Sequence, residues 1–256
     1  MNNKSFDYRR IAEGYAKDRP FLHEHVIDRL KEKKQILQKY ESGLDIGCGA
    51  GLSTRALRMI CHRVIGTDIS EHMIMAASAL YDDAGYTFLQ CSAEETRAEM
   101  ESIDVVTAAG VINWVDEKKF LPAIQKVLKP EGLLLIYDFW ISDQMIGCEE
   151  YTRWWHEQYL KEFPKPPRKE NIWTDEDVEP YGLHIEEQET YTMTWETDRQ
   201  QFIRFMLLQS NVAAQVEGKN RNPEEVRAWF EEGLSAFWKE ERKELIFEGY
   251  SWYLRR

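Results

Sequence analysis

Short apolar runs alternate with one-sided helical stripes along the first 140 residues of the chain. Five runs have the length of buried strands, and between them apolar residues recur every three to four positions, as on one face of a helix. This alternation predicts a parallel sheet whose strands are joined by right-handed helical crossovers. A turn at Lys129-Pro130-Glu131-Gly132 is expected to end the last helical stripe. The predicted strands are Leu44–Gly47, Arg63–Asp68, Thr87–Cys91, Asp104–Ala109 and Leu133–Phe139, and the predicted helices are Leu52–Ile60, Glu71–Tyr81 and Glu117–Leu128.

The pattern differs before and after this alternating region. Residues 6–39 have a helical pattern, in which Asp18 is expected to cap a helix with Pro20 in its first turn. Beyond Phe139, aromatic residues at helical spacing predict an amphipathic helix around Tyr151 to Tyr159. The later predicted strands are Leu183–Trp195 and Leu245–Leu254, and the later predicted helices are Phe202–Gln209 and Pro223–Trp238.

Together these patterns predict one α/β domain over residues 1–256. We expect an N-terminal helical segment at 1–40 and a ligand-binding core at 41–140. Helical insertions at 141–181 and 199–240 are expected to cover the site, with the final strands at 182–198 and 241–256.

A glycine-rich loop follows the first predicted strand and opens into a helix. Gly47, Gly49 and Gly51 are spaced two apart, so a ligand can approach the backbone closely. The free N–H groups of the following helix are directed to the same place. Asp68 ends the next strand, at the distance where an acid meets a ribose diol in nucleotide-binding α/β folds. The sequence therefore predicts a nucleoside-bearing cofactor.

The spacing of the glycines distinguishes between cofactors. A dinucleotide fingerprint needs a third glycine three residues after the second, and counting from Gly49 that position is Leu52. Asp45, two residues before Gly47, would repel a pyrophosphate. An acid suits a zwitterion such as S-adenosylmethionine, whose ammonium can bond to turn carbonyls and, through water, to the acid.

At these motifs the chain resembles class I S-adenosylmethionine-dependent methyltransferases of the small-molecule type. The likeness covers Leu44 to Asp138 and comprises Asp45–Gly51, Thr67–Ser70 with Met73, Cys91–Glu94 and Ala108–Trp114. It implies a doubly wound, seven-stranded, mostly parallel sheet of the Rossmann-like methyltransferase fold. It also implies S-adenosylmethionine as cofactor and S-adenosylhomocysteine as product. The Arg-Pro near the start, Asn113-Trp114 and the aromatic C-terminal part are similar to trans-aconitate methyltransferases and their relatives.

The resemblance and the chemistry of the side chains suggest roles at the cofactor. Asp68 is expected to accept hydrogen bonds from both ribose hydroxyls, and Arg19 suits the carboxylate of the cofactor. Met73 fits an adenine wall or ordinary helix packing equally well. Glu94 fits either the adenine amino group or the first turn of a helix, where an acid is favourable. The predicted cofactor-binding residues are Tyr15, Arg19, Asp45, Gly47, Cys48, Gly49, Asp68, Ile69, Met73, Ser92, Ala93, Glu94 and Ala109.

The acceptor side is predicted less fully. Trp114 could face a sulfonium through its ring or fill the core, and Asn113 could orient a polar substrate group. Trp140 and Asp138 are further candidate substrate contacts, and a carboxylate acceptor would need no base. The candidate bases are Asp138, His156 and His184, and the sequence does not choose among them. The candidate cations for an anionic acceptor are Arg153, Arg168 and Arg204.

Charge and cysteine content exclude several other functions. A net charge of −12 opposes general nucleic-acid binding, which needs clustered Lys and Arg. No apolar run approaches the ~20 residues that span a membrane, and the N-terminus has no signal-peptide core. The four cysteines form no C-x-x-C pair, so we expect buried free thiols in a cytoplasmic protein and no metal. The expected partner is a small-molecule substrate, and the oligomeric state is open.

The leading interpretation is transfer of a methyl group from S-adenosylmethionine to a small molecule, a carboxylate or a hydroxyl among the options. An NAD-dependent oxidoreductase is the second, and the glycine spacing opposes it. A non-catalytic module that binds S-adenosylmethionine is the third, and an intact glycine loop does not exclude it.

Overall fold

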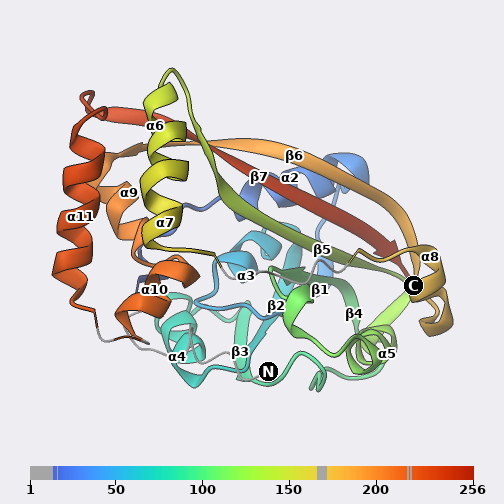
Figure 1. Ribbon diagram of the computed structural model, residues 1–256. Helices are drawn as coiled ribbons and strands as arrows, with labels where there is room; N and C mark the ends of the chain where they lie inside the picture. Colours follow the sequence, from blue (N-terminus) through green and yellow to red (C-terminus); the bar gives the residue numbers. More distant parts are fainter. Residues whose placement is uncertain (1–13, 16, 166–171, 218, 220) are drawn as a thin grey trace.

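The computed structural model describes residues 14–256 apart from 16, 166–171, 218 and 220. Its centre is a sheet of seven strands in the order β3-β2-β1-β4-β5-β7-β6 (Figure 1). Strands β1 to β5 run parallel to one another, whereas β7 is antiparallel to both β5 and β6. The strands are β1 Tyr40–Ile46, β2 Cys61–Asp68, β3 Tyr86–Gln90, β4 Ile103–Ala109, β5 Leu128–Met145, β6 His184–Asp198 and β7 Arg242–Arg255.

This arrangement confirms the doubly wound, mostly parallel α/β fold. The strand order reverses between β1 and β4, so β1 has a parallel neighbour on each side. At such a reversal the crossover helices leave on opposite faces and a crevice opens at the carboxyl ends of the strands. The glycine loop follows β1 and lies at this crevice.

Helices cover both faces of the sheet. On one face, α2 (His23–Lys33) and α3 (Leu52–Leu57) pack through Val26, Ile27 and Leu57 against strand residues. On the other, α5 (Glu117–Val127) buries a stripe of Phe120, Leu121 and Ile124. The helix α4 (Glu71–Leu80) contacts β2 and β3. None of the helices in the described part of the chain is long and apolar enough to cross a membrane.

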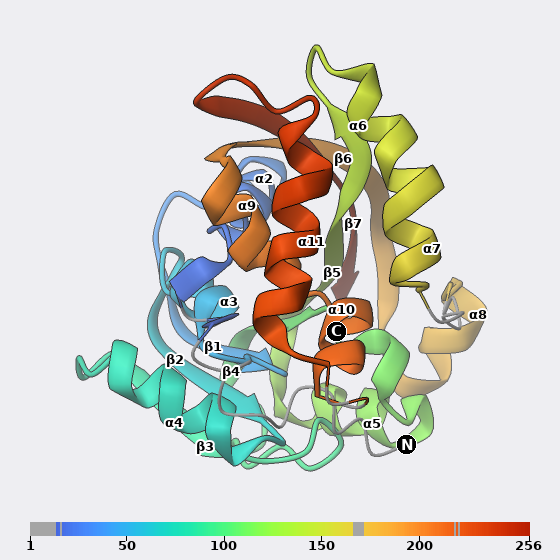
Figure 2. The same cartoon turned by 60° about the vertical axis from the view of Figure 1, so that its left-hand side comes forward.

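The antiparallel strands extend far beyond the parallel core and carry the remaining helices. Figures 1 and 2 show α6, α7, α9, α10 and α11 gathered at one end of the sheet, beside the outer parts of β5, β6 and β7. Here aromatic side chains make the core, and Tyr151, Tyr159 and Phe230 are fully buried. The bounds are α6 Glu149–Trp154, a π-helical turn Trp155–Tyr159, α7 Leu160–Glu162, α8 Asp175–Val178, α9 Arg199–Met206, α10 Ser210–Val216 and α11 Pro223–Ser235.

Most predicted elements are confirmed, but β5 is much longer than predicted. It spans Leu128–Met145, so it includes the residues expected to form a turn and enters the region expected to be a helical cover. Glu131, with φ of +63°, marks an irregularity within the strand instead of its end. The predicted length was wrong because the outer part of β5 pairs with β7, as far as Met145 opposite Leu245, a contact that local pattern does not report.

The predicted N-terminal cap was also wrong. The helix α2 begins at His23 after Leu22, which makes no side-chain capping bond. Asp18 instead accepts a hydrogen bond from Nε of Arg204 at 2.9 Å, which joins the N-terminal segment to α9. Residues 6–13 of the predicted helical segment lie outside the described residues.

Candidate active site

The loop between β1 and α3 exposes its backbone to a cavity. Gly47 has φ of +67°, which favours glycine, and a Cβ there would lie 2.3 Å from Cγ2 of Val111. Gly49 has φ of +52°, and the nearest neighbour of a Cβ built there is Sδ of Met73 at 4.0 Å. Gly47 is therefore glycine for packing and conformation, while Gly49 leaves its backbone open to a ligand.

The carboxylate of Asp68 is held at the end of β2 by two backbone donors. Its Oδ2 accepts from N–H of Gly49 at 2.9 Å, and its Oδ1 accepts from N–H of Ser70 at 2.8 Å. The Ser70 hydroxyl in turn accepts from N–H of Met73 and caps α4. The acid is thus fixed beside the glycine loop, and it lines the cavity with Gly49.

Asp45 has a different position from the one predicted. Its side chain is completely buried and accepts hydrogen bonds from hydroxyls of Ser53, Thr54 and Thr107 at 2.6, 2.7 and 2.8 Å. It does not line the cavity, whereas Ser53 does. Burial raises the pKa of Asp45 to about 6, although the three hydroxyl bonds act in the opposite direction. Geometry therefore makes Asp45 the anchor that joins β1, α3 and β4 beneath the loop.

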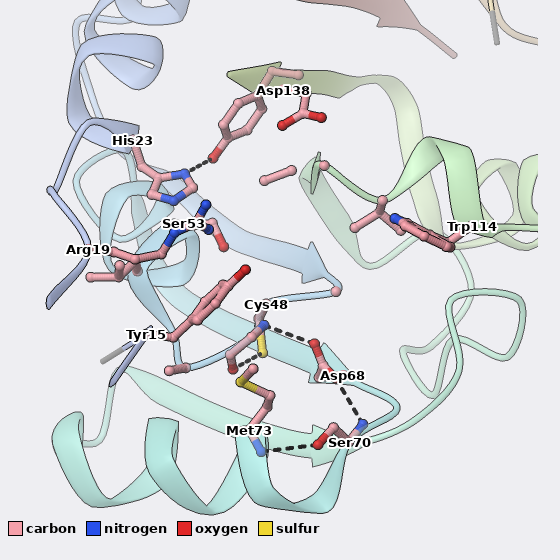
Figure 3. Close-up of a pocket in the computed structure, with 18 of the residues that line it drawn as sticks. Tyr15, Arg19, His23, Cys48, Ser53, Asp68, Ser70, Met73, Trp114 and Asp138 are labelled. Carbon is pink, nitrogen blue, oxygen red and sulfur yellow. Dashed lines mark hydrogen bonds between the residues drawn. The ribbon is translucent and has the colours of Figure 1, made fainter. Parts of the chain in front are cut away.

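One cavity of about 500 Å³ brings together most of the predicted residues at the carboxyl ends of the parallel strands. Figure 3 shows Asp68, Ser70 and Met73 at one end, and His23 and Asp138 at the other. Trp114 and Trp140 lie on the lining and are 51% and 41% exposed, so they form part of its rim. All the predicted cofactor and substrate residues except Asp45 and Asn113 line this cavity.

The N-terminal segment and the turn after α9 close over the glycine loop. Tyr15 packs on a small apolar cluster of Ala50, Met73, Leu208 and Ala213. The guanidinium of Arg19 lies 4.3 Å from the centre of the Tyr15 ring, and both residues line the cavity. The predicted pair therefore lies where a cation could meet an anionic group of a bound ligand.

The inner end of the cavity contains residues that were not predicted. Nδ1 of His23 lies 2.9 Å from the hydroxyl of Tyr137, and the His23 ring meets Phe139 edge-on with centroids 4.9 Å apart. No role was predicted for His23 from the sequence. Other cavity-lining residues that were not predicted include Ser53, Gly110, Ile141, Phe205, Gln209 and Phe247.

Several candidate bases and cations lie elsewhere. His156 pairs with Asp143 at 2.6 Å, and neither it nor the exposed His184 lines the cavity. Arg204 forms an ion pair with Asp18, and neither Arg204 nor Arg153 lines the cavity. Arg168 falls outside the described residues. Of the three candidate bases, only Asp138 lines the cavity; its Oδ1 accepts from N–H of Phe139 at 2.8 Å.

Glu94 reaches the cavity but also has a structural partner, since its Oε1 accepts from N–H of Asp116 at 3.0 Å. The four cysteines are buried and free, as predicted. Within the described residues, no group of three or more His, Cys, Asp and Glu is placed to hold a metal ion.

Comparison with known families agrees with this geometry. Residues 44–136 match a family model described as a methyltransferase domain. A ubiquinone biosynthesis O-methyltransferase of Bradyrhizobium diazoefficiens is 35% identical over 119 residues, 43% of this chain and 47% of that relative. The chain thus matches about half the length of such curated relatives. The narrower likeness to trans-aconitate methyltransferases is not supported by these comparisons and stays a prediction.

Solved structures share the fold at low identity. A candidate type II methyltransferase from Anaeromyxobacter dehalogenans has a TM-score of 0.67 at 19% identity, covering 91% of this chain and 94% of that one. The [4+2]-cyclase SpnF has a TM-score of 0.52 at 18% identity, with 91% and 80% covered. The fold alone therefore accommodates more than one chemistry. Residues 44–136 therefore match a methyltransferase domain, and the seven-stranded sheet has the Rossmann-like fold that solved methyltransferase structures share.

Proposed function

We propose that the protein transfers a methyl group from S-adenosylmethionine to an oxygen of a small-molecule acceptor. The observation that carries the proposal is the single cavity in which the open backbone of Gly49 and the fixed carboxylate of Asp68 lie together. Both are placed at the carboxyl ends of neighbouring parallel strands, where such folds bind nucleotides.

The residues present fit this cofactor. The carboxylate of Asp68 lines the cavity, and a carboxylate, which accepts at about four sites, suits the two adjacent hydroxyls of a ribose. Gly49 presents an open backbone to the methionine portion, and Ile69 and Met73 supply apolar walls for the adenine. Arg19 suits the carboxylate. When bound, S-adenosylmethionine supplies a methyl group on a positively charged sulfur, and the acids at the end of the sheet suit that charge.

The residues of this chain contribute to catalysis by positioning the acceptor and by excluding water. Holding the acceptor oxygen in line with the methyl group at close range supplies much of the rate. The aromatic rings at the inner end, with Phe205 and Phe247 almost completely buried, keep bulk water away from it. An uncharged acceptor must also lose a proton, and Asp138 and His23 are the side chains at this end that could hold it.

The choice of oxygen is supported by the relatives, which are named as O-methyltransferases. Their likeness covers mainly the cofactor-binding region, so the acceptor of this protein is not taken from theirs. An oxidoreductase is opposed by the glycine spacing. A non-catalytic module would bind the cofactor without turnover.

Two measurements test the proposal in sequence. Calorimetry with S-adenosylhomocysteine is expected to show binding in the wild-type protein. Incubation of labelled S-adenosylmethionine with separate panels of phenols, carboxylates and amines is then expected to label an oxygen acceptor. No cofactor binding would exclude the proposal, whereas binding without transfer to any panel would favour the non-catalytic module. Transfer to amines alone would contradict the assignment of oxygen.

A further inference from the structure

The imidazole of His23 is held rigidly at the inner end of the cavity. It is the first residue of α2 and only 9% exposed, yet it is part of the cavity lining. The Tyr137 hydroxyl bonds Nδ1 at 2.9 Å, and Tyr137 and Phe139 both contact the imidazole edge-on, with centroids 5.7 and 4.9 Å away. Three contacts from β5 therefore fix one ring nitrogen and the plane of the ring.

The surroundings of His23 are largely aromatic and apolar. Phe139, Ile141, Phe205 and Phe247 line the same end of the cavity, and the last three are at most 2% exposed. Such walls suit a planar or apolar body with few polar groups. The polar side chains at this end include His23 and Asp138, and Tyr137, which bonds to His23 (Figure 3).

His23 is uncharged at neutral pH. Burial, and secondarily the charge of Arg19, lower its pKa to about 3. A neutral imidazole has one N–H and one lone pair, so in the tautomer whose Nδ1–H donates to the Tyr137 hydroxyl, Nε2 carries the lone pair. A lone pair accepts from an uncharged hydroxyl, and a neutral ring does not repel a sulfonium in the same cavity.

We propose that His23 receives the hydroxyl of the methyl acceptor, a hydroxyl carried on an aromatic or otherwise apolar ring, and accepts its proton during transfer. Tyr137 is the positioning residue that orients His23 through Nδ1. The inference rests on the proposed methyltransferase function and adds to it the class of acceptor and the residue that contacts it.

The proposed step balances. The acceptor oxygen forms a bond to the methyl carbon as the bond from carbon to sulfur breaks, and sulfur keeps that electron pair. The proton passes from oxygen to Nε2 of His23 and then to water. An oxygen that gains a methyl group while still protonated becomes strongly acidic, so even a weak base can take its proton.

A binding experiment tests the contact without turnover. The probes are phenol and benzoate, added to protein saturated with S-adenosylhomocysteine and followed by NMR titration. We expect wild type and His25→Gln to bind phenol in preference to benzoate, and His23→Gln to bind phenol at least ten-fold more weakly with unchanged cofactor affinity. His25 is the matched control, since it is exposed on the same helix. If His23→Gln binds phenol as tightly as wild type does, or if wild type does not bind phenol, the inference is wrong. If wild type does not bind S-adenosylhomocysteine, the proposed function is wrong.

Turnover distinguishes a reacting group from a structural one. With a phenolic acceptor, His23→Ala should lower kcat by about 100- to 1,000-fold, the scale of general-base catalysis, and added imidazole should restore part of it. Tyr137→Phe should lower kcat less and keep the fold, because it removes only the hydroxyl. Melting curves identify variants that fail to fold. If Asp138→Asn abolishes transfer while a folded His23→Ala retains it, Asp138 is the base and the assignment of His23 is wrong.

Discussion

The two ends of the cavity are built in different ways. At the cofactor end, the ligand-facing groups come from the turns after β1 and β2, and backbone atoms of Gly49 and Ser70 hold the acid in place. The inner end, where we propose that the methyl acceptor binds, is called the acceptor end. Here side chains from α2, β5, α9 and β7 meet, and His23 bonds to Tyr137 across 114 positions of the chain. Local sequence motifs therefore form the cofactor end, whereas the acceptor end forms only through tertiary packing of elements that are distant in sequence.

The difference has an energetic side. The helices beside the acceptor end rest on a dense aromatic core, in which the rings of Phe230 and Phe163 stack at 5.6 Å and Trp154 lies 6.1 Å from Phe230. The cofactor end depends on a few hydrogen bonds around Asp45 and Asp68. We therefore expect core variants near the acceptor end to change stability, and variants of the loop acids to separate binding from stability.

The largest effect is expected for Phe230→Ala. The side chain is completely buried, so truncation removes apolar contacts and leaves a cavity, costing about 3–5 kcal/mol of unfolding free energy. Urea unfolding measures the loss, and Leu37→Ala, at a side chain that is 94% exposed, is the matched control. Affinity for S-adenosylhomocysteine should stay unchanged in the folded protein. A parallel drop in affinity would show that the two ends are not independent.

The second largest effect is expected for Asp45→Ala, which should lower the free energy of unfolding more than it lowers cofactor affinity. It leaves the hydroxyls of Ser53, Thr54 and Thr107 without their common acceptor, and an unsatisfied buried polar group costs about 1–3 kcal/mol. We expect a loss of about 2–3 kcal/mol, measured by urea unfolding. Asp104→Ala is the comparison, because that acid also bonds between strands but is only partly buried. A stable variant with abolished cofactor binding would restore the direct role predicted for Asp45.

Asp68→Ala should weaken binding of S-adenosylhomocysteine by about 1.5–3 kcal/mol, the scale of hydrogen bonds to a charged group. This corresponds to roughly 10- to 150-fold in Kd. The loss of stability should be smaller than for Asp45→Ala, because Asp68 is only partly buried. Calorimetry measures the affinity, with exposed Asp82→Ala as control. Unchanged affinity would remove Asp68 from the cofactor site.

These contrasts also explain what the sequence can predict. The parallel strands and the glycine loop were found because strand, turn and helix patterns are local, and Gly47 and Asp68 lie where their spacing implied. The same local pattern could not tell that Asp45 turns inward, since its hydroxyl partners include Thr107, far along the chain.

The acceptor end was predicted poorly for a physical reason. His23 is the first residue of a helix and carries no local signal, and its environment exists only once α2 packs against β5. The extended part of β5 was missed for the same reason, because its pairing with β7 joins residues about a hundred positions apart.

The smallest effect concerns the ion pairs that hold α2, and with it His23, against the outer strands. Glu186 of β6 pairs with Lys34, the residue that follows α2, at 2.5 Å and with Arg255 of β7 at 2.9 Å. Burial alone raises the pKa of Glu186, but hydrogen bonds from Arg255 and Lys34 outweigh it and lower the pKa to about 2. A carboxyl with a depressed pKa stabilises the fold above its unfolded value of 4.5, and the contribution is lost as the pH falls towards 2.

Glu186→Gln should therefore destabilise the protein by about 1 kcal/mol at pH 7, because solvent screening reduces the benefit of partly exposed pairs. The difference from wild type should shrink as the pH falls below 4.5, and urea unfolding at a series of pH values from 3 to 7 measures it. Exposed Glu176→Gln should show no such trend. A difference that is constant with pH would mean that Glu186 acts through packing instead of charge. If the ion pairs also orient α2 at the acceptor end, Glu186→Gln should bind phenol more weakly than wild type at pH 7, and this difference should also shrink below pH 4.5. The affinity for the cofactor should not change.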